Sequence, residues 1–123
     1  MTMRPKTFRA RPVETRQQQA KRHDERRGSA RERGYTGAWD KARAGYLRSH
    51  PLCAYCELDG VVTPATLVDH LYPHRTFEGV FWVKEWWVAS CRACHDGPKQ
   101  AAERAGRLAI DALARRLGRP LLT

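Results

Sequence analysis

The chain has no long hydrophobic run. Its apolar stretches are at most about five residues long, whereas a membrane-spanning helix needs about 20. The basic residues at its N-terminus are not followed by the apolar segment of a secretory signal, so we expect no membrane contact and a reducing, cytoplasmic environment. A length of 123 residues allows one small domain, which excludes an enzyme that pairs a nicotinamide-binding domain with a substrate domain.

Acidic residues are scarce. The chain has 13 Asp and Glu against 23 Lys and Arg, a formal net charge of +10. Residues 1–34 alone contain 11 basic and 4 acidic residues and few large apolar side chains, so burial cannot offset the entropy of ordering them. We predict a basic N-terminal arm, residues 1–34, that is disordered or conditionally helical, followed by a folded domain, residues 35–123. The arm is either a contact for a polyanion such as nucleic acid or a solubilising tail.

Capping residues and apolar spacing predict three helices in the folded domain, at about 37–50, 98–106 and 107–117. Thr36 is the expected cap of the first helix, and Asp96 of the second. The third carries an apolar stripe that could serve the core or a dimer, so the oligomeric state stays open. Short β-favouring runs predict a two-stranded ribbon; they lie at 61–63, 65–68 and 86–89. The expected fold is a small α+β unit with a thin apolar core, which a structural ion would help to fold.

All four cysteines fall into two C-x-x-C pairs separated by 34 residues. We call Cys53 to Cys56 the first knuckle and Cys91 to Cys94 the second knuckle. Two intervening residues let both thiolates of a knuckle point at one ion, and two knuckles supply the four sulfurs of a closed, structural Zn²⁺ site. A redox motif or two disulfides are the alternatives, but a redox C-x-x-C would be expected in a βαβ context that the sequence lacks.

Three of the five histidines stand beside other potential ligands or a knuckle. His70 directly follows Asp69, His74 follows a proline, and His95 directly follows Cys94, so the second knuckle holds it in place. A carboxylate and an imidazole that meet near the knuckle could hold a second, catalytic divalent cation with open coordination positions. An adjacent imidazole would then be free to act as a base.

Three runs carry a resemblance to a known family: LVDHLYPHR at 67–75, FW at 81–82 and CRACHD at 91–96. Together with the two knuckles they resemble the HNH endonucleases, most closely the small type that phages and prophages encode. The resemblance spans about residues 52–99. It implies a ββα-metal (HNH) core over about residues 52–106, a C-terminal helix over about residues 107–117, and a bacterial or phage-infected cell. It also implies a metal-dependent DNA endonuclease, with DNA and a phage packaging terminase as partners.

The resemblance implies roles for single residues by their motif positions. His70 would be the general base that takes a proton from the attacking water. Asp69 and His95 would ligate the catalytic cation, which could be Mg²⁺, Mn²⁺, Ni²⁺ or Zn²⁺. Arg75 and Lys99 could contact DNA phosphates.

Two features depart from the family pattern. The family places an asparagine about five positions before the third cysteine, where this chain has Trp86, and the chain contains no asparagine. A main-chain carbonyl could orient the His70 ring instead. The family's Cys-His-x-x-Lys spacing is stretched between His95 and Lys99, so the following helix is expected to begin late. The alternative function is therefore a non-catalytic, zinc-stabilised DNA-binding module with a degenerate site.

His74 and the tryptophans receive simpler interpretations. His74 could be a further ligand or a DNA contact, but a loop residue is the preferred interpretation. Trp82, Trp86 and Trp87 are expected to pack in the core rather than to stack on bases.

Overall fold

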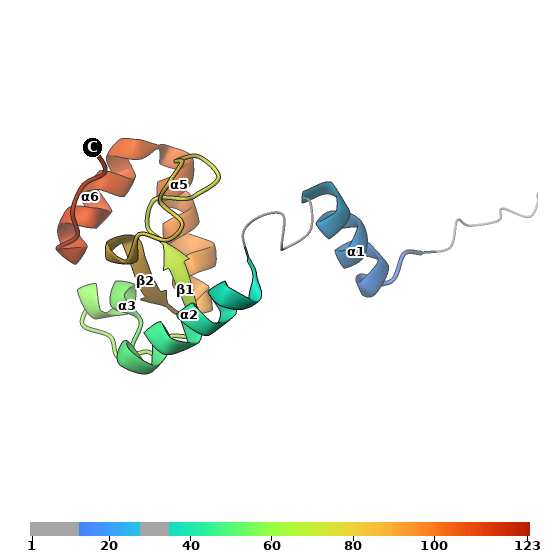
Figure 1. The fold of residues 1–123 in the computed structure, drawn as a ribbon, viewed down its shortest axis with the longest axis horizontal. Coiled ribbons are helices and arrows are strands. Elements are labelled where there is room, and N and C mark those ends of the chain that lie inside the picture. Colours follow the sequence, from blue (N-terminus) through green and yellow to red (C-terminus); the bar gives the residue numbers. More distant parts are fainter. Residues whose placement is uncertain (1–12, 28–34) are drawn as a thin grey trace, which may run out of the picture. The chain divides into compact units, whose positions relative to one another are not determined.

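The computed structural model of the protein describes residues 13–27 and 35–123 (Figure 1). The chain divides into two units, Met1–Thr36 and Gly37–Thr123, and each is considered by itself. Within the described ranges, no helix combines the length and the apolar character that crossing a membrane requires.

The described part of the first unit contains one helix, α1 (Arg16–Arg27). A capping box begins it: the main-chain N–H of Thr15 donates to Oε1 of Gln18 at 2.9 Å, and the N–H of Gln18 donates to Oγ1 of Thr15 at 3.1 Å. The helix is polar on all sides and therefore has no apolar face with which to pack. The sequence predicted an arm that is disordered or conditionally helical, and residues 16–27 are helical here. For residues 1–12 and 28–34 this prediction lies outside the described residues.

The second unit is built around a two-stranded antiparallel sheet, β1 (Leu67–His70) and β2 (Trp87–Ser90). The register pairs Leu67 with Ser90 and His70 with Trp87. The predicted ribbon is thus confirmed, although each strand begins one or two residues later than expected. In the described part of the chain the run 61–63 forms no strand. The carbonyl of Thr63 accepts a hydrogen bond from the N–H of Cys53 at 2.8 Å, next to an isolated antiparallel bridge between Leu52 and Pro64.

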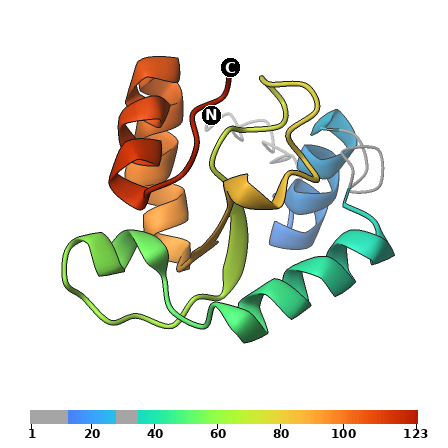
Figure 2. The same ribbon diagram turned by 60° about the vertical axis from the view of Figure 1, so that its left-hand side comes forward.

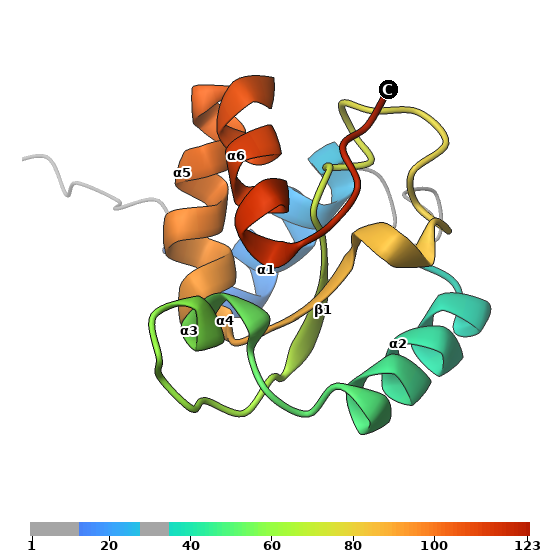
Figure 3. The same ribbon diagram turned by 90° about the vertical axis from the view of Figure 1, so that its left-hand side faces the viewer.

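Helices cover both sides of this sheet. They are α2 (Gly37–Ser49), the short α3 (Ala54–Leu58), the 3₁₀ turn η1 (Lys84–Trp86), α4 (Arg92–Cys94), the π turn η2 (His95–Lys99), α5 (Gln100–Ala105) and α6 (Arg107–Leu117). Figures 2 and 3 show α2 on one side of the sheet and the paired α5 and α6 on the other. In addition, α3 packs against β2 and α6. The first and third predicted helices are confirmed within one residue.

The second predicted helix begins in a different place. The sequence predicted a start at Pro98 with Asp96 as the cap, and this prediction is wrong. The helix begins at Arg92, directly after the second knuckle, and continues through α4, η2 and α5 to Ala105. Proline lacks the N–H that an α-helix interior needs, and its ring collides with the preceding turn. The wider π turn, which adds one residue to the turn, accommodates Pro98 inside the helix.

The core lies between the sheet, α3 and α6. Its largest fully buried apolar side chains are Leu71, Tyr72, Val80, Val88 and Ile110. The Tyr72 hydroxyl donates to Oδ1 of Asp111 at 2.5 Å, which attaches α6 to the segment after β1. Ile110 belongs to the apolar stripe of α6, so this stripe packs on the core of the same chain.

Candidate metal centres and active site

The four cysteine sulfurs form one cluster. They all lie within 4.8 Å of one another, with Sγ of Cys56 3.8 Å from that of Cys91 and 3.5 Å from that of Cys94. Four sulfurs at about 2.3 Å from a tetrahedral Zn²⁺ would be about 3.8 Å apart. All four thiols are free of disulfides. The donor set and its spacing therefore fit a structural zinc ion.

The thiols of this cluster need a cation in order to ionise together. Burial raises the pKa of Cys53, but hydrogen bonds from the main chain and from the thiols of Cys56 and Cys91 together outweigh it and lower the value to about 7. Burial and the neighbouring thiols raise the pKa of Cys94. Adjacent thiolates repel one another, so a divalent cation would displace the remaining protons and hold all four sulfurs.

Asp69 and His95 meet beside the second knuckle. Asp69 lies on β1 with only 4% of its surface exposed, and His95 opens η2 directly after Cys94. Oδ1 of Asp69 is 3.6 Å from Nε2 of His95, while Nδ1 of His95 is held by Oδ1 of Asp96 at 2.9 Å. Two ligand atoms at about 2.1 Å from a shared ion would be about 3.0–3.6 Å apart. This pair therefore fits a site for a divalent cation.

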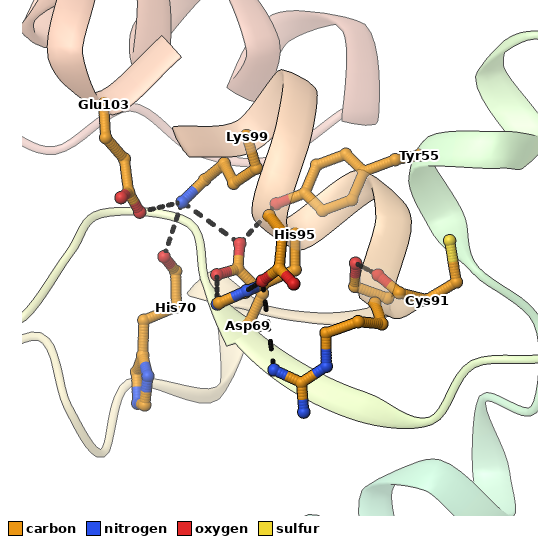
Figure 4. Close-up of polar contacts among 10 residues, drawn as sticks. Tyr55, Asp69, His70, Cys91, His95, Lys99 and Glu103 are labelled. Atoms are coloured by element: carbon orange, nitrogen blue, oxygen red, sulfur yellow. Dashed lines mark hydrogen bonds and ion pairs between the residues drawn. The ribbon is translucent and has the colours of Figure 1, made fainter. Parts of the chain in front are cut away.

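A buried cluster holds the other oxygen of Asp69 (Figure 4). Oδ2 accepts a hydrogen bond from the Tyr55 hydroxyl at 2.6 Å and lies 3.1 Å from Nζ of Lys99. Lys99 also donates to the main-chain carbonyl of His70 at 3.0 Å and to Oε1 of Glu103 at 2.6 Å. Burial raises the pKa of Asp69 in spite of the Lys99 ammonium. A cation beside Oδ1 would favour the ionised carboxylate.

Lys99 therefore lies in the interior. The resemblance implied that it could contact a DNA phosphate, but its side chain is 1% exposed and its ammonium is bonded to three protein oxygens. Sequence reasoning missed Tyr55 and Glu103 altogether. The available signals were the position of Tyr55 inside the first knuckle and the i, i+4 spacing of Lys99 and Glu103. Arg75, the other predicted phosphate contact, is exposed.

The His70 ring is held by a main-chain carbonyl. Its Nε2 lies 3.0 Å from the carbonyl oxygen of Phe81, which also accepts from Nε1 of Trp87 at 2.9 Å. Trp39 of α2 stacks on the ring with a centroid distance of 4.8 Å and an interplanar angle of 27°. Because a carbonyl can only accept, the neutral ring carries its proton on Nε2 and leaves Nδ1 as the basic nitrogen.

The His70 ring is also neutral at pH 7. Burial, the nearby His74 ring and the Lys99 ammonium lower its pKa to about 4. In Figure 4 the ring points away from the Asp69 carboxylate, as expected for neighbours on a strand. The structure thus brings Asp69 and His95 together and places the His70 ring apart from them.

The tryptophans and His74 are the remaining residues that the sequence analysis considered. Trp87 is buried and Trp86 is partly buried, as expected, but Trp82 is 54% exposed, so its assignment to the core is wrong. Trp86, at the family's asparagine position, donates from Nε1 to the carbonyl of Pro120 at 2.8 Å. It therefore binds the C-terminal segment. The His74 ring lies edge-on to His70, at a centroid distance of 4.9 Å.

Comparison with known proteins agrees with this architecture. No protein-family model matches the chain, and no curated protein matches it. The fold is similar to the crystal structure of the HNH endonuclease of the deep-sea thermophilic bacteriophage GVE2 with a manganese ion. The two share 20% sequence identity with a TM-score of 0.54, over 75% of this chain and 98% of the phage protein. The chain therefore has the α+β fold of an HNH endonuclease, as the sequence predicts.

Proposed function

We propose that the protein is a metal-dependent DNA endonuclease that hydrolyses phosphodiester bonds. The observation that carries the proposal is the 3.6 Å approach of Oδ1 of Asp69 to Nε2 of His95. A carboxylate and an imidazole in this arrangement leave the rest of the coordination sphere open for water and a phosphate oxygen. The fold of a phage HNH endonuclease, which was crystallised with manganese, supports the nuclease class.

Asp69 and His95 would hold the catalytic cation, for which Mg²⁺, Mn²⁺, Ni²⁺ and Zn²⁺ are the candidates. The chemistry that such a cation supplies is the neutralisation of negative charge on the scissile phosphate and on the leaving 3′ oxygen. The four cysteines hold a separate, structural zinc ion. Because His95 directly follows Cys94, that zinc site fixes where His95 points.

His70 is the general base. Its neutral ring accepts a proton from water at Nδ1, while the Phe81 carbonyl, 3.0 Å from Nε2, fixes the orientation of the ring. A negatively charged phosphate beside the ring raises the pKa of His70 in the complex, which strengthens the base. In-line displacement needs the attacking water and the leaving oxygen on opposite sides of phosphorus. For this geometry, His70 and the Asp69–His95 pair must reach one phosphorus from opposite sides.

DNA is bound by basic groups around this site. Arg75 is exposed on the segment that follows β1 and contacts phosphate, and the basic arm, residues 1–34, adds sequence-independent affinity. The biological setting is a bacterial or phage-infected cell, where the protein acts beside a DNA-packaging terminase.

Cleavage of supercoiled plasmid tests the proposal. The full chain, loaded with zinc, is incubated with plasmid and Mg²⁺ or Mn²⁺. The wild type and the exposed-histidine control His50→Ala should both nick the plasmid, whereas His70→Ala should be slower by at least about 100-fold. Equal cleavage by all three proteins would remove His70 from the mechanism.

A non-catalytic DNA-binding module is the second candidate. One observation favours it: the proposed base His70 is only 6% exposed, so water must reach a nearly covered ring. If the wild type retards the plasmid in a gel and leaves it supercoiled with every cation tested, the binding module is the correct function.

A further inference from the structure

We infer that Tyr55 and Lys99 make the Asp69–His95 site select small divalent cations such as Mn²⁺ over Ca²⁺. They do so by restricting Asp69 to coordination through one oxygen. The inference deepens the proposed function, since it rests on the cation site named there. Tyr55 and Lys99 are positioning residues, because they act on the cation through Asp69.

The two oxygens of Asp69 have different surroundings. Oδ2 is engaged by the Tyr55 hydroxyl at 2.6 Å and by Nζ of Lys99 at 3.1 Å. Oδ1 faces Nε2 of His95 at 3.6 Å. A cation that chelates the carboxylate through both oxygens would have to displace both donors from Oδ2. A cation that needs only Oδ1 leaves them in place.

The donors on Oδ2 cannot move aside easily. Tyr55 is 7% exposed and Lys99 is 1% exposed, so water cannot replace a lost partner of either group. Nζ of Lys99 is fixed further by the His70 carbonyl at 3.0 Å and by Oε1 of Glu103 at 2.6 Å. A buried polar group left without a partner is costly, so the arrangement resists rotation of the carboxylate.

The charge of Lys99 does not by itself exclude cations. Its ammonium lies between two carboxylates, Asp69 and Glu103, so these three groups together carry one net negative charge when ionised. The effect of Lys99 on the cation is therefore mainly one of geometry: it holds Oδ2 and leaves Oδ1 available.

Cations differ in how they use a carboxylate. Ca²⁺ takes about 6–8 oxygen ligands at about 2.3–2.6 Å and often binds carboxylates through both oxygens. Mg²⁺ prefers six ligands at about 2.0–2.1 Å and keeps several waters. Among the ions that accept carboxylate and water ligands, Mn²⁺ also accepts an imidazole nitrogen more readily than Ca²⁺ does. One carboxylate oxygen, one nitrogen and bound waters therefore suit Mn²⁺ and leave Ca²⁺ short of protein oxygens.

Calorimetric titration with Mn²⁺ and with Ca²⁺ tests the inference. The samples are the zinc-loaded full chain, Tyr55→Phe, Lys99→Met and the control Lys41→Met, which removes the same charge from the exposed surface of α2. The ratio of the Ca²⁺ to the Mn²⁺ dissociation constant should fall about tenfold in Tyr55→Phe and in Lys99→Met, and should stay at the wild-type value in Lys41→Met. Zinc content and the melting temperature show whether each variant is folded.

The outcomes separate this inference from the proposed function. Tyr55→Phe removes a single oxygen atom, so it decides the result if Lys99→Met does not fold. An unchanged ratio in folded Tyr55→Phe overturns the selectivity inference even if the wild type cleaves DNA. Mn²⁺ binding with the expected ratio change, but without plasmid cleavage, supports the inference and overturns the nuclease. A wild type that binds neither cation overturns both.

Discussion

The hydroxyl of Tyr55 donates a hydrogen bond of 2.6 Å to Oδ2 of Asp69. Tyr55 stands between the two cysteines of the first knuckle, and His95 directly follows the last cysteine of the second. Each knuckle thus positions one neighbour of the Asp69 carboxylate: Tyr55 at Oδ2 and His95 at Oδ1. Zinc binding and the geometry of the Asp69–His95 pair are therefore linked, because Tyr55 and His95 are each covalently bonded to a cysteine of the cluster.

We predict that the purified protein carries one zinc ion and needs it to fold. Chelation, or the substitution Cys56→Ser, should cause a cooperative loss of structure because the small core depends on the cross-link. Elemental analysis gives the stoichiometry, and circular dichroism follows unfolding, with restored zinc as the control for chelation. A protein with two disulfides and no zinc would contradict the prediction.

We predict that the His70 ring stays neutral, with its proton on Nε2, throughout the physiological pH range. Its folded pKa of about 4 lies below the usual value of about 6.5. Nitrogen-15 NMR of the histidine rings reports both the tautomer and the pKa. A measured pKa near the usual value would contradict the burial of this ring.

The lowered pKa of His70 also predicts how the stability of the fold changes with pH. Between about pH 6.5 and pH 4 the unfolded chain binds a proton at His70 and the folded chain does not. The free energy of unfolding should therefore fall as the pH drops through this window, by up to about 3 kcal/mol. His70→Gln should lack this component when the two proteins are compared by urea unfolding at each pH.

We predict that Asp69→Asn and His95→Ala lose the divalent cation and keep the zinc. Affinity for Mn²⁺ should fall at least about tenfold, because each variant loses a direct ligand. Asp59→Asn is the matched control, since Asp59 is exposed and pairs with Arg116 at 3.6 Å. Calorimetry measures the Mn²⁺ affinity, and elemental analysis checks the zinc. Unchanged Mn²⁺ binding in both variants would show that the cation is held elsewhere.

We predict that removal of residues 1–34 weakens DNA binding and flattens its salt dependence. For each phosphate that the arm neutralises, its removal should reduce the slope of log K against log salt by about 0.9. Fluorescence anisotropy on one duplex at several salt concentrations measures that slope. The same slope in both proteins would leave the arm as a solubilising tail.

We predict that Trp86 contributes to stability and Trp82 does not. Trp86→Ala removes a partly buried indole and its bond to the Pro120 carbonyl, and should cost about 3 kcal/mol. Trp82 is 54% exposed, so Trp82→Ala should cost less than about 1 kcal/mol. The midpoints of urea unfolding compare the stabilities of the two variants. Equal losses would mean that exposure is a poor guide to packing at these positions.

The sequence predicted those parts of the molecule that short-range spacing controls. Two residues between cysteines determine a knuckle, and the second knuckle holds His95, the residue that directly follows it. Short β-favouring runs located both strands within two residues. The α6 boundaries followed from Gly106 and from Gly118, whose φ of 69° ends the helix.

The parts that sequence could not predict depend on contacts between distant segments. Nothing local distinguishes Lys99 from an exposed lysine, because its burial depends on Asp69 and the His70 carbonyl, about 30 positions earlier. Trp82 and Trp87 are the same residue type in similar apolar surroundings in the sequence. Only the packing of α2 and the sheet makes one of them exposed and the other buried. The Phe81 carbonyl that holds the His70 ring belongs to the main chain, so no residue type in the sequence indicates this contact.

The π turn at His95–Lys99 has a consequence for comparing this chain with its relatives. The extra residue is inserted inside a continuous helix, while Lys99 still reaches the strand that carries Asp69. Against a sequence without such a turn, an alignment that allows gaps only in loops would shift every residue from Lys99 onward by one position. Sequence searches that allow a one-residue insertion after the Cys-His pair should therefore find divergent homologues that searches without gaps in helices overlook.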